Sequence, residues 1–261
     1  MDQNQLIERI VAEVVARMGS QAGAKAAGGV AVLPAASSPG VPALAPSDIA
    51  KYIDHTMLRP EAPTAAFDKL CQEAVQYHFF AVCVNSCRIA YVARKLQGTG
   101  IKVCSVVGFP LGAMTSRAKA FETRQAIEDG ASEIDMVINV GLLKSGDYHG
   151  VEEDIRAVRR ATRGNTVLKV IIETALLTQD EKVMACELSK KAGADFVKTC
   201  TGFGGGGATV EDVSLMRRVV SHEMGVKAST GVRTYKQALD MIGAGATRLG
   251  CGSSVAIVTG A

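Results

Sequence analysis

The sequence predicts an α/β protein: a (β/α)8 barrel, the TIM-barrel architecture, preceded by a flexible N-terminal extension with an amphipathic helix. From Ser47 onward, short runs rich in Val, Ile and Ala alternate with longer amphipathic segments, at a spacing of roughly 20–35 residues. Eight such runs within about 215 residues fit a closed barrel near the small end of its normal range. Charged residues lie near the ends of several runs, where barrels of this type carry their chemistry.

The eight apolar runs are predicted to be buried parallel strands, with helices between them, for example at residues 65–76 and 114–128. A doubly wound open sheet would need a topological switch and usually fewer strands. The sequence also has no GxGxxG that opens a helix after a first strand, and no GxxxxGK[ST]. The predicted strands centre on Ile53, Val82, Val103, Ile134, Val170, Val197, Val226 and Leu249.

The composition is that of an ordinary soluble globular protein, with 261 residues, 48% hydrophobic and 21% charged. A net charge of +3, without a basic cluster, argues against nucleic acid as a partner. No apolar run approaches the roughly 20 residues that span a bilayer, so no membrane association is expected. The seven cysteines are scattered, which favours a reducing cytoplasm. Cys83 and Cys87 lack a second pair and nearby histidines at zinc-ligand spacing, so no metal site is expected.

The N-terminal residues 1–18 are predicted to form an amphipathic helix, which Gly19 ends. Residues 19–46 are rich in Gly, Ala, Ser and Pro and have no periodic apolar face, so they are predicted to be a flexible linker. The barrel is then expected over residues 47–261. The helix places on one stripe the side chains of Leu6, Ile7, Ile10, Val11, Val14, Val15 and Met18.

A helix this short is marginal alone in water, so we expect it to fold against a partner. It lacks the basic segment and continuous apolar core of a secretory signal, and Asp2, Glu8 and Glu13 contradict the acid-poor rule of mitochondrial transit peptides. A short amphipathic helix on such a tether resembles the encapsulation peptides of bacterial microcompartment cargo enzymes. That resemblance implies docking to a shell protein, and a location inside a microcompartment. The alternative is an oligomerisation or self-packing helix.

Two lysines indicate the chemistry. Lys198 and Lys227 each lie at the end of a short apolar run and precede a glycine-bearing turn. An unpaired ammonium in a buried strand costs several kcal/mol, and loss of its proton gives a neutral amine that can attack a carbonyl. The pair therefore predicts a Schiff-base enzyme that acts on a phosphorylated substrate. Alternatively, the lysine stems lie along the sheet while their heads reach water.

Other polar residues are predicted to converge with these lysines at the carboxyl ends of the strands, where (β/α)8 enzymes carry their active sites. We expect Lys198 to end the sixth strand and Lys227 the seventh. The remaining strand-end residues are Asp54 (first strand), Cys83 and Asn85 (second), Asp135 (fourth), and Lys169 and Glu173 (fifth).

Residues 48–258 resemble the deoxyribose-phosphate aldolases, which are class I (Schiff-base) aldolases. The matching segments occur in the family's order and spacing. They are YIDHTML, AVCVNS, SVVGFPLGAMTSRAKAFETRQAIEDGASEIDMVINVG, LKVIIET, GADFVKTCTGFGGGGAT and GVKASTGVRT. The resemblance implies a lyase that reversibly cleaves 2-deoxy-D-ribose 5-phosphate into D-glyceraldehyde 3-phosphate and acetaldehyde. Such an enzyme requires no metal or cofactor. We also expect the protein to form a homo-oligomer.

The resemblance assigns the roles residue by residue. Lys198 matches the lysine that forms the imine, and Lys227 matches a second lysine whose positive charge would favour the neutral amine at Lys198. Asp135 matches the aspartate that works with this second lysine in proton transfer, and Asp54 an acidic residue that orients the substrate hydroxyl groups. Lys169 matches a strand lysine that gives electrostatic support. The alternative for Asp135 and Lys169 is a structural ion pair in the barrel mouth.

Phosphate binding is expected from the loops after the sixth, seventh and eighth strands, where glycines let backbone N–H groups approach phosphate oxygens. The chain departs from the family here: it has Thr230-Gly231 in place of two glycines, and Gly252 within the last loop. The alternative functions are a Schiff-base aldolase with another aldehyde or sugar phosphate, and a weakly active barrel that serves mainly as a scaffold. The predicted phosphate-binding residues are Gly202, Thr230, Gly231, Gly252 and Ser253.

Overall fold

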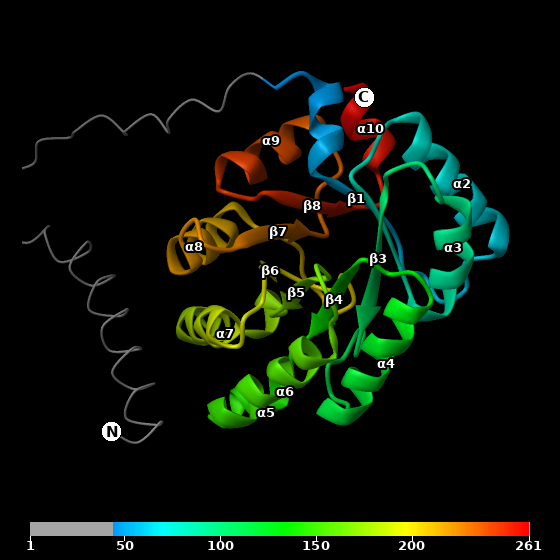
Figure 1. Ribbon diagram of the computed structural model, residues 1–261. Helices are drawn as coiled ribbons and strands as arrows, with labels where there is room; N and C mark the ends of the chain where they lie inside the picture. Colours follow the sequence, from blue (N-terminus) through cyan, green and yellow to red (C-terminus); the bar gives the residue numbers. More distant parts are fainter. Residues whose placement is uncertain (1–43, 261) are drawn as a thin grey trace, which may run out of the picture.

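Eight parallel strands form a closed barrel with helices outside it (Figure 1). The computed structural model describes residues 44–260. Each strand pairs in parallel with the next in sequence, and β1 pairs with β8 to close the barrel. The predicted (β/α)8 fold is therefore confirmed.

All eight predicted strand centres lie inside observed strands. The strands are β1 (Ile53–Met57), β2 (Ala81–Val84), β3 (Lys102–Val107), β4 (Glu133–Val137), β5 (Val167–Ile171), β6 (Phe196–Lys198), β7 (Gly225–Ser229) and β8 (Arg248–Cys251). Most strand residues are buried, because the barrel interior covers one face and the helices the other.

The two helices predicted by range are also confirmed, beginning one residue earlier and two residues later than expected. The helices are α2 (Thr64–Gln76), α3 (Ile89–Lys95), α4 (Ser116–Glu128), α5 (Val140–Lys144), α6 (Tyr148–Ala161), α7 (Gln179–Lys191), α8 (Val210–Val220), α9 (Tyr235–Gly243) and α10 (Ser254–Thr259). Short 3-10 helices are η1 (Pro46–Tyr52), η2 (Ser86–Arg88) and η3 (Thr174–Leu176).

The spacing of apolar residues gives each long helix an apolar face, and this face packs against the barrel. In α6, for example, Val151, Ile155 and Val158 recur at helical spacing and are fully buried. Asp147 caps the N-terminus of this helix, because its carboxylate accepts a hydrogen bond from the backbone N–H of Gly150. The helices thus hold the strands in the register that brings the polar interior residues together.

The first described residues already pack on the barrel. Leu44 packs against the hydrophobic core, and the hydroxyl of Tyr235 donates a hydrogen bond to its carbonyl oxygen. Pro46 begins η1, which lies against α10. The last three residues of the predicted linker therefore contact the folded domain. The predicted docking helix, residues 1–18, and residues 19–43 of the predicted linker lie outside the described residues.

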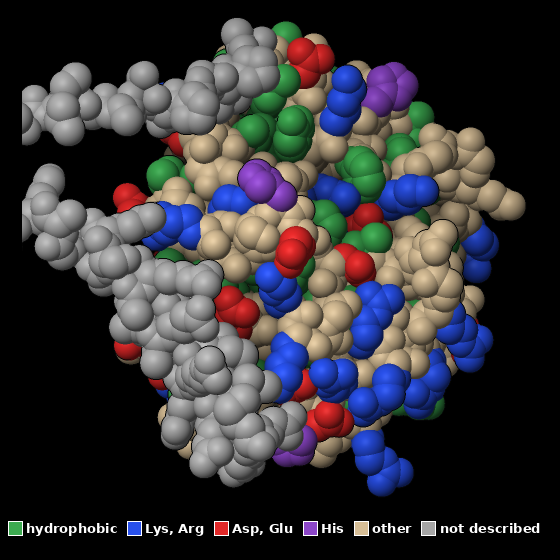
Figure 2. Space-filling view, turned by 60° about the vertical axis from the view of Figure 1, so that its left-hand side comes forward, with side chains coloured by type: hydrophobic (Ala, Val, Ile, Leu, Met, Phe, Trp, Pro, Cys, Tyr) green, Lys and Arg blue, Asp and Glu red, His purple; other side chains and the backbone are tan. Residues whose placement is uncertain are grey.

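On the face shown in Figure 2, Lys and Arg side chains are spread among Asp and Glu side chains. Within residues 44–260, no helix combines the length and the apolar character needed to cross a membrane.

Candidate active site

The predicted charged residues do meet, but deeper in the barrel than expected. Lys198 is the last residue of β6, as predicted. Asp54, Asp135, Lys169 and Lys227 instead lie within their strands, so the prediction that each ends its strand is wrong. A strand continues as long as its backbone groups are paired, whatever the polarity of a side chain. The charged cluster consequently fills the barrel interior, and the glycine-bearing loops lie beyond it.

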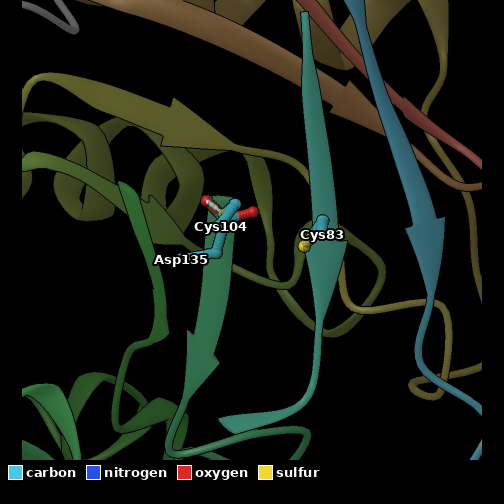
Figure 3. A group of neighbouring side chains, drawn as sticks. All are labelled: Cys83, Cys104 and Asp135. Atoms are coloured by element: carbon cyan, nitrogen blue, oxygen red, sulfur yellow. Dashed lines mark hydrogen bonds between the residues drawn. The ribbon is translucent and has the colours of Figure 1, made fainter. Parts of the chain in front are cut away.

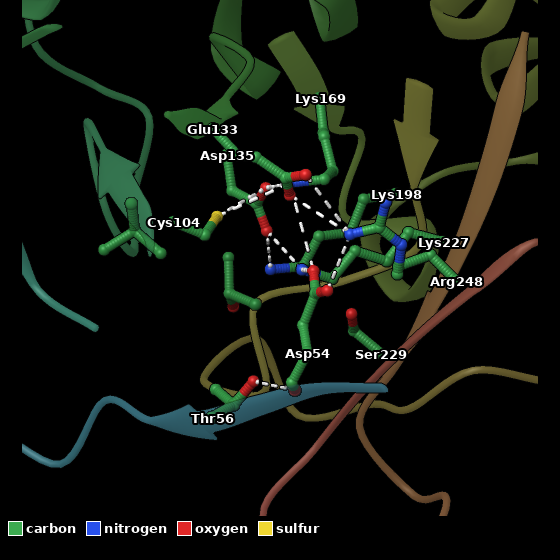
Figure 4. Close-up of polar contacts among 12 residues, drawn as sticks. Asp54, Thr56, Cys104, Glu133, Asp135, Lys169, Lys198, Lys227, Ser229 and Arg248 are labelled. Atoms are coloured by element: carbon green, nitrogen blue, oxygen red, sulfur yellow. Dashed lines mark hydrogen bonds and ion pairs between the residues drawn. The ribbon is translucent and has the colours of Figure 1, made fainter. Parts of the chain in front are cut away.

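The two lysines share one carboxylate oxygen. Strand register places Lys198 beside Lys227, and Asp135 Oδ2 accepts hydrogen bonds from both Nζ atoms, at 2.9 and 2.8 Å (Figure 4). Lys227 also forms an ion pair with Asp54. Lys198 is 2% exposed and Lys227 is fully buried, so their heads do not reach water as the alternative interpretation required.

Lys169 holds the other oxygen of the same aspartate. Its Nζ lies 2.8 Å from Asp135 Oδ1 and 2.6 Å from Glu133 Oε2. Asp135 and Lys169 therefore form an ion pair, as the structural alternative expected, but this pair belongs to a larger cluster that includes the two other lysines. Glu133 lies two residues before Asp135 on β4, so both side chains point to the interior.

Glu133 and Arg248 are members of the cluster that the sequence interpretation missed. Arg248 Nη1 lies 2.8 Å from Asp54 Oδ1 and 3.1 Å from Glu133 Oε2. The two-residue spacing from Asp135 could have indicated Glu133. In the sequence, Arg248 stands out only as a charged residue in an apolar run. Its partners lie on β1 and β4, far from it in the chain, so neighbouring residues do not indicate its role.

The ion pairs dominate the protonation of the cluster. Burial alone would raise the pKa of Asp54, but the positive charges of Lys227, Lys169 and Arg248 outweigh it and lower that pKa to about 2. Burial likewise opposes ionisation of Asp135, whose pKa is nevertheless held well below its usual range by Lys169, Lys198 and Lys227.

Lys227 behaves conversely: burial would lower its pKa, and the charges of Asp135 and Asp54 raise it above the usual value. Lys227 is therefore an ammonium in the free protein, and its two carboxylate partners are ionised.

Two cysteines border Asp135 on the side of β2 and β3 (Figure 3). The Cys104 thiol donates a hydrogen bond to Asp135 Oδ1 at 3.1 Å, and burial raises the pKa of Cys104 well above its ordinary value. The neighbouring Cys104 lowers the pKa of Cys83. Donor atoms of Cys83, Cys104 and Asp135 lie within 4.8 Å of one another. Because the carboxylate of Asp135 already binds the amino groups of three lysines, we do not assign a metal site to this trio.

The loops after β6 and β7 lie against each other. Gly202 has φ +89°, and a side chain there would place its Cβ 2.8 Å from Thr230 Oγ1. Thr230 and Gly231 also have positive φ, 72° and 88°, so the turn requires the left-handed conformation at both positions. Three of the five predicted phosphate-binding residues, Gly202, Thr230 and Gly231, are thus neighbours.

Gly252 and Ser253, the other two, follow β8. With His55, Thr56 and Glu73 they line a cavity of about 310 Å³ between β1, α2 and the start of α10. His55 is hydrogen-bonded to Glu73 and Ser254, at 2.9 and 2.8 Å, which gives it a structural role there.

Glu173 organises the glycine-rich loop that follows Lys198. Its carboxylate accepts hydrogen bonds from the backbone N–H of Thr201, at 3.2 Å, and from the Thr201 hydroxyl, at 2.5 Å. The Thr201 hydroxyl oxygen in turn accepts from the backbone N–H of Phe203 at 3.0 Å. Glu173 lies just after β5, as predicted, and its contacts show that it orders this loop.

A closed (β/α)8 barrel whose interior brings a buried lysine pair onto one carboxylate is an arrangement for carbonyl chemistry through a lysine amine. Residues 49–255 match the family model described as DeoC/LacD family aldolase. The chain therefore belongs to the DeoC/LacD aldolase family and is an aldolase, which is a type of lyase.

Individual relatives agree with this membership. The chain is 58% identical over 213 residues to a deoxyribose-phosphate aldolase of Streptococcus equi subsp. zooepidemicus, covering 82% of this chain and 96% of that protein. It is 59% identical over 217 residues to that of Thermococcus gammatolerans, with coverages of 82% and 96%. The tetrameric deoxyribose phosphate aldolase of Aeropyrum pernix superposes with a TM-score of 0.77 at 32% identity, covering 82% of this chain and 91% of that one.

Proposed function

We propose that this chain reversibly cleaves 2-deoxy-D-ribose 5-phosphate into D-glyceraldehyde 3-phosphate and acetaldehyde through an imine on Lys198. The observation that carries the proposal is the single Asp135 oxygen that binds both Lys198 and Lys227. The relatives named deoxyribose-phosphate aldolase support the choice of substrate.

Imine formation needs a neutral amine at Lys198. An N–H of that amine can still donate to Asp135, which leaves the nitrogen lone pair free to attack the substrate aldehyde. The new C–N bond replaces the carbonyl oxygen, which leaves as water after protonation, and the product is a positively charged iminium. Lys227, an ammonium, is placed to supply the proton through Asp135.

The iminium then accepts the electron pair of the bond between the second and third carbons. As that bond breaks, the hydroxyl on the third carbon loses its proton, and D-glyceraldehyde 3-phosphate departs. Lys227, which gave up a proton when the carbonyl oxygen left as water, takes this proton back through Asp135, so the pair returns to its starting charge. The remaining enamine takes a proton on carbon, and water releases acetaldehyde and restores Lys198. Asp54 fixes Lys227 from the opposite side and, in this proposal, orients the substrate hydroxyl groups.

The phosphate would bind at the backbone N–H groups around Gly202, Thr230 and Gly231. These loops directly follow β6, which ends at Lys198, and the neighbouring strand β7. All three residues have positive φ, a backbone conformation that also occurs in anion-binding turns. Gly252 and Ser253 complete the proposed site from the loop after β8.

Borohydride trapping with acetaldehyde tests the imine, and a substrate panel tests the phosphate. We expect the wild-type protein to gain a stable adduct, and to use 2-deoxy-D-ribose 5-phosphate with a kcat/KM at least about 100-fold above that for 2-deoxy-D-ribose, because a charge-assisted phosphate site contributes several kcal/mol. Trapping with equal use of both sugars would favour a Schiff-base aldolase for another substrate. Absence of any adduct would favour the scaffold alternative.

We also propose that residues 1–18 dock the enzyme to a microcompartment shell, and that the barrel forms homo-oligomers. The apolar stripe of residues 1–18 and its Gly/Ala/Pro-rich tether support the first proposal. The tetrameric relative from Aeropyrum pernix supports the second.

Deleting residues 1–43 is expected to leave kcat and KM within about twofold of the full-length values, because the charged cluster and the described barrel remain complete. The same deletion should abolish recruitment of the enzyme to the shell, and residues 1–18 fused to a fluorescent protein should suffice to recruit that protein. A second variant tests the apolar stripe within the full chain: Ile10→Glu with Val14→Glu should abolish recruitment as the deletion does. A truncated enzyme without activity, together with a fusion that is not recruited, would show that the segment belongs to the barrel.

A further inference from the structure

The charges within the connected ion-pair cluster of the barrel interior do not balance. Within residues 44–260, the connected ion-pair cluster has one more cation than it has carboxylates. The cations are Lys169, Lys198, Lys227 and Arg248, and the carboxylates are Asp54, Glu133 and Asp135. No side chain in this set is more than 8% exposed. An uncompensated buried charge is costly, so loss of one proton from the cluster is favoured.

The contacts single out the member that gives up this proton. Arg248 contacts both Asp54 and Glu133, and a guanidinium stays protonated. Lys169 and Lys227 each contact two or more carboxylates. Lys198 has one carboxylate contact, with Asp135 Oδ2, and shares that oxygen with Lys227. Lys198 is therefore the ammonium that the cluster stabilises least.

We propose that Glu133 and Arg248 are positioning residues that set the pH range in which Lys198 forms the imine. With Arg248, the cluster has one cation more than it has carboxylates. This excess positive charge favours the neutral amine at Lys198. Glu133 opposes it by adding a negative charge. Both act through Asp54 and Lys169, which link them to Asp135. This inference rests on the proposed role of Lys198.

The position of Arg248 is fixed on several sides. Its guanidinium lies 3.7 Å from the ring centre of Phe80 and 5.5 Å from that of Phe196, in addition to its two carboxylate contacts. Aromatic rings cannot neutralise the charge as a carboxylate does, so they hold the cation without removing the imbalance.

Charged and titratable groups face Lys198 from all sides of the barrel. They are Asp54 on β1, Cys83 on β2, Cys104 on β3, Glu133 and Asp135 on β4, Lys169 on β5, Glu173 after β5, Cys200 after β6, Lys227 on β7 and Arg248 on β8. Of the three thiols, Cys104 donates its proton to Asp135 and Cys200 donates its proton to the carbonyl oxygen of Ser229. The Glu173 carboxylate is bound by the N–H and the hydroxyl of Thr201, and within residues 44–260 it forms no ion pair with the cluster. Cys83 is the remaining thiol that could add a negative charge, so the test includes it.

The test is the pH at which borohydride trapping with acetaldehyde reaches half its maximum. Glu133→Gln increases the positive excess, so this midpoint should move down by about one pH unit. Arg248→Gln removes the excess and should move it up by a similar amount. The double variant restores an excess of one and should return toward the wild-type midpoint. Arg248→Lys keeps the charge and should leave the midpoint in place, even if turnover falls.

Two controls complete the design. Glu152 is a carboxylate 2% exposed that pairs with Arg156 and Lys191 outside the barrel, and Glu152→Gln should not move the midpoint. Cys83→Ser should not move it either, and a downward shift would mean that a thiolate already balances the cluster. Shifts of the same sign in Glu133→Gln and Arg248→Gln, or none in either, would overturn the inference while leaving the aldolase proposal intact. If Arg248→Gln does not fold, the shift of the trapping midpoint in Glu133→Gln, compared with that in Glu152→Gln, decides whether the inference holds. A wild-type protein that traps no aldehyde would instead remove the proposed function itself.

Discussion

Replacing Lys198 by Arg or Ala is expected to abolish imine trapping and to lower kcat by at least about four orders of magnitude, the scale of loss for a covalent nucleophile. Arginine keeps a positive charge beside Asp135 but cannot form an imine, and alanine removes the nitrogen altogether. Mass spectrometry of the wild-type protein, after trapping with acetaldehyde and digestion, should find an ethyl group on the peptide that contains Lys198.

The matched control is Lys182, which pairs with Asp212 at 2.6 Å and is one-tenth exposed, on the outer helices α7 and α8. Lys182→Arg should retain both trapping and turnover. An adduct found mainly on Lys227 or Lys169 would contradict the assignment of the nucleophile.

Lys227→Leu is expected to lower activity at neutral pH by at least about 100-fold, the usual weight of a lost acid or base group. It should also move the trapping midpoint to higher pH. Without Lys227, three cations face three carboxylates, so the proton stays on Lys198. The measurement is the pH dependence of both kcat and trapping.

The same variant removes two buried ion pairs, but Arg248 still pairs with Asp54, and Lys198 and Lys169 still pair with Asp135. The loss of unfolding free energy should therefore stay below the about 3–5 kcal/mol that an uncompensated buried charge costs. Urea denaturation at pH 7 measures this loss. Lys227→Arg keeps the charge and should keep the trapping midpoint within the range of the wild type. A Lys227→Leu protein with unchanged pH dependence would show that Lys227 does not control the state of Lys198.

The barrel could be predicted from the sequence because its signals are local. Each strand is a short apolar run, such as the one centred on Val170, and each long helix repeats apolar residues at helical spacing. The period of an apolar pattern and the length of an apolar run are properties of neighbouring residues, so both can be recognised without knowledge of tertiary contacts. The extent of each strand was less predictable. Asp54 is the second residue of β1 and Lys169 the middle residue of β5, because hydrogen bonds to neighbouring strands decide where a strand stops.

The sequence by itself determined the (β/α)8 architecture, the family resemblance and the identity of the lysine pair, since these depend on periodicity and on motifs contiguous in the chain. Only the tertiary structure decided that Lys198 and Lys227 share one oxygen of Asp135, and that Glu133 and Arg248 join them. Those contacts arise from closure of the barrel, which brings β1, β4 and β8 to within ion-pair distance although more than 100 residues separate β4 from β8. Charge balance depends on such distances and on burial, and neither is written in the order of the residues.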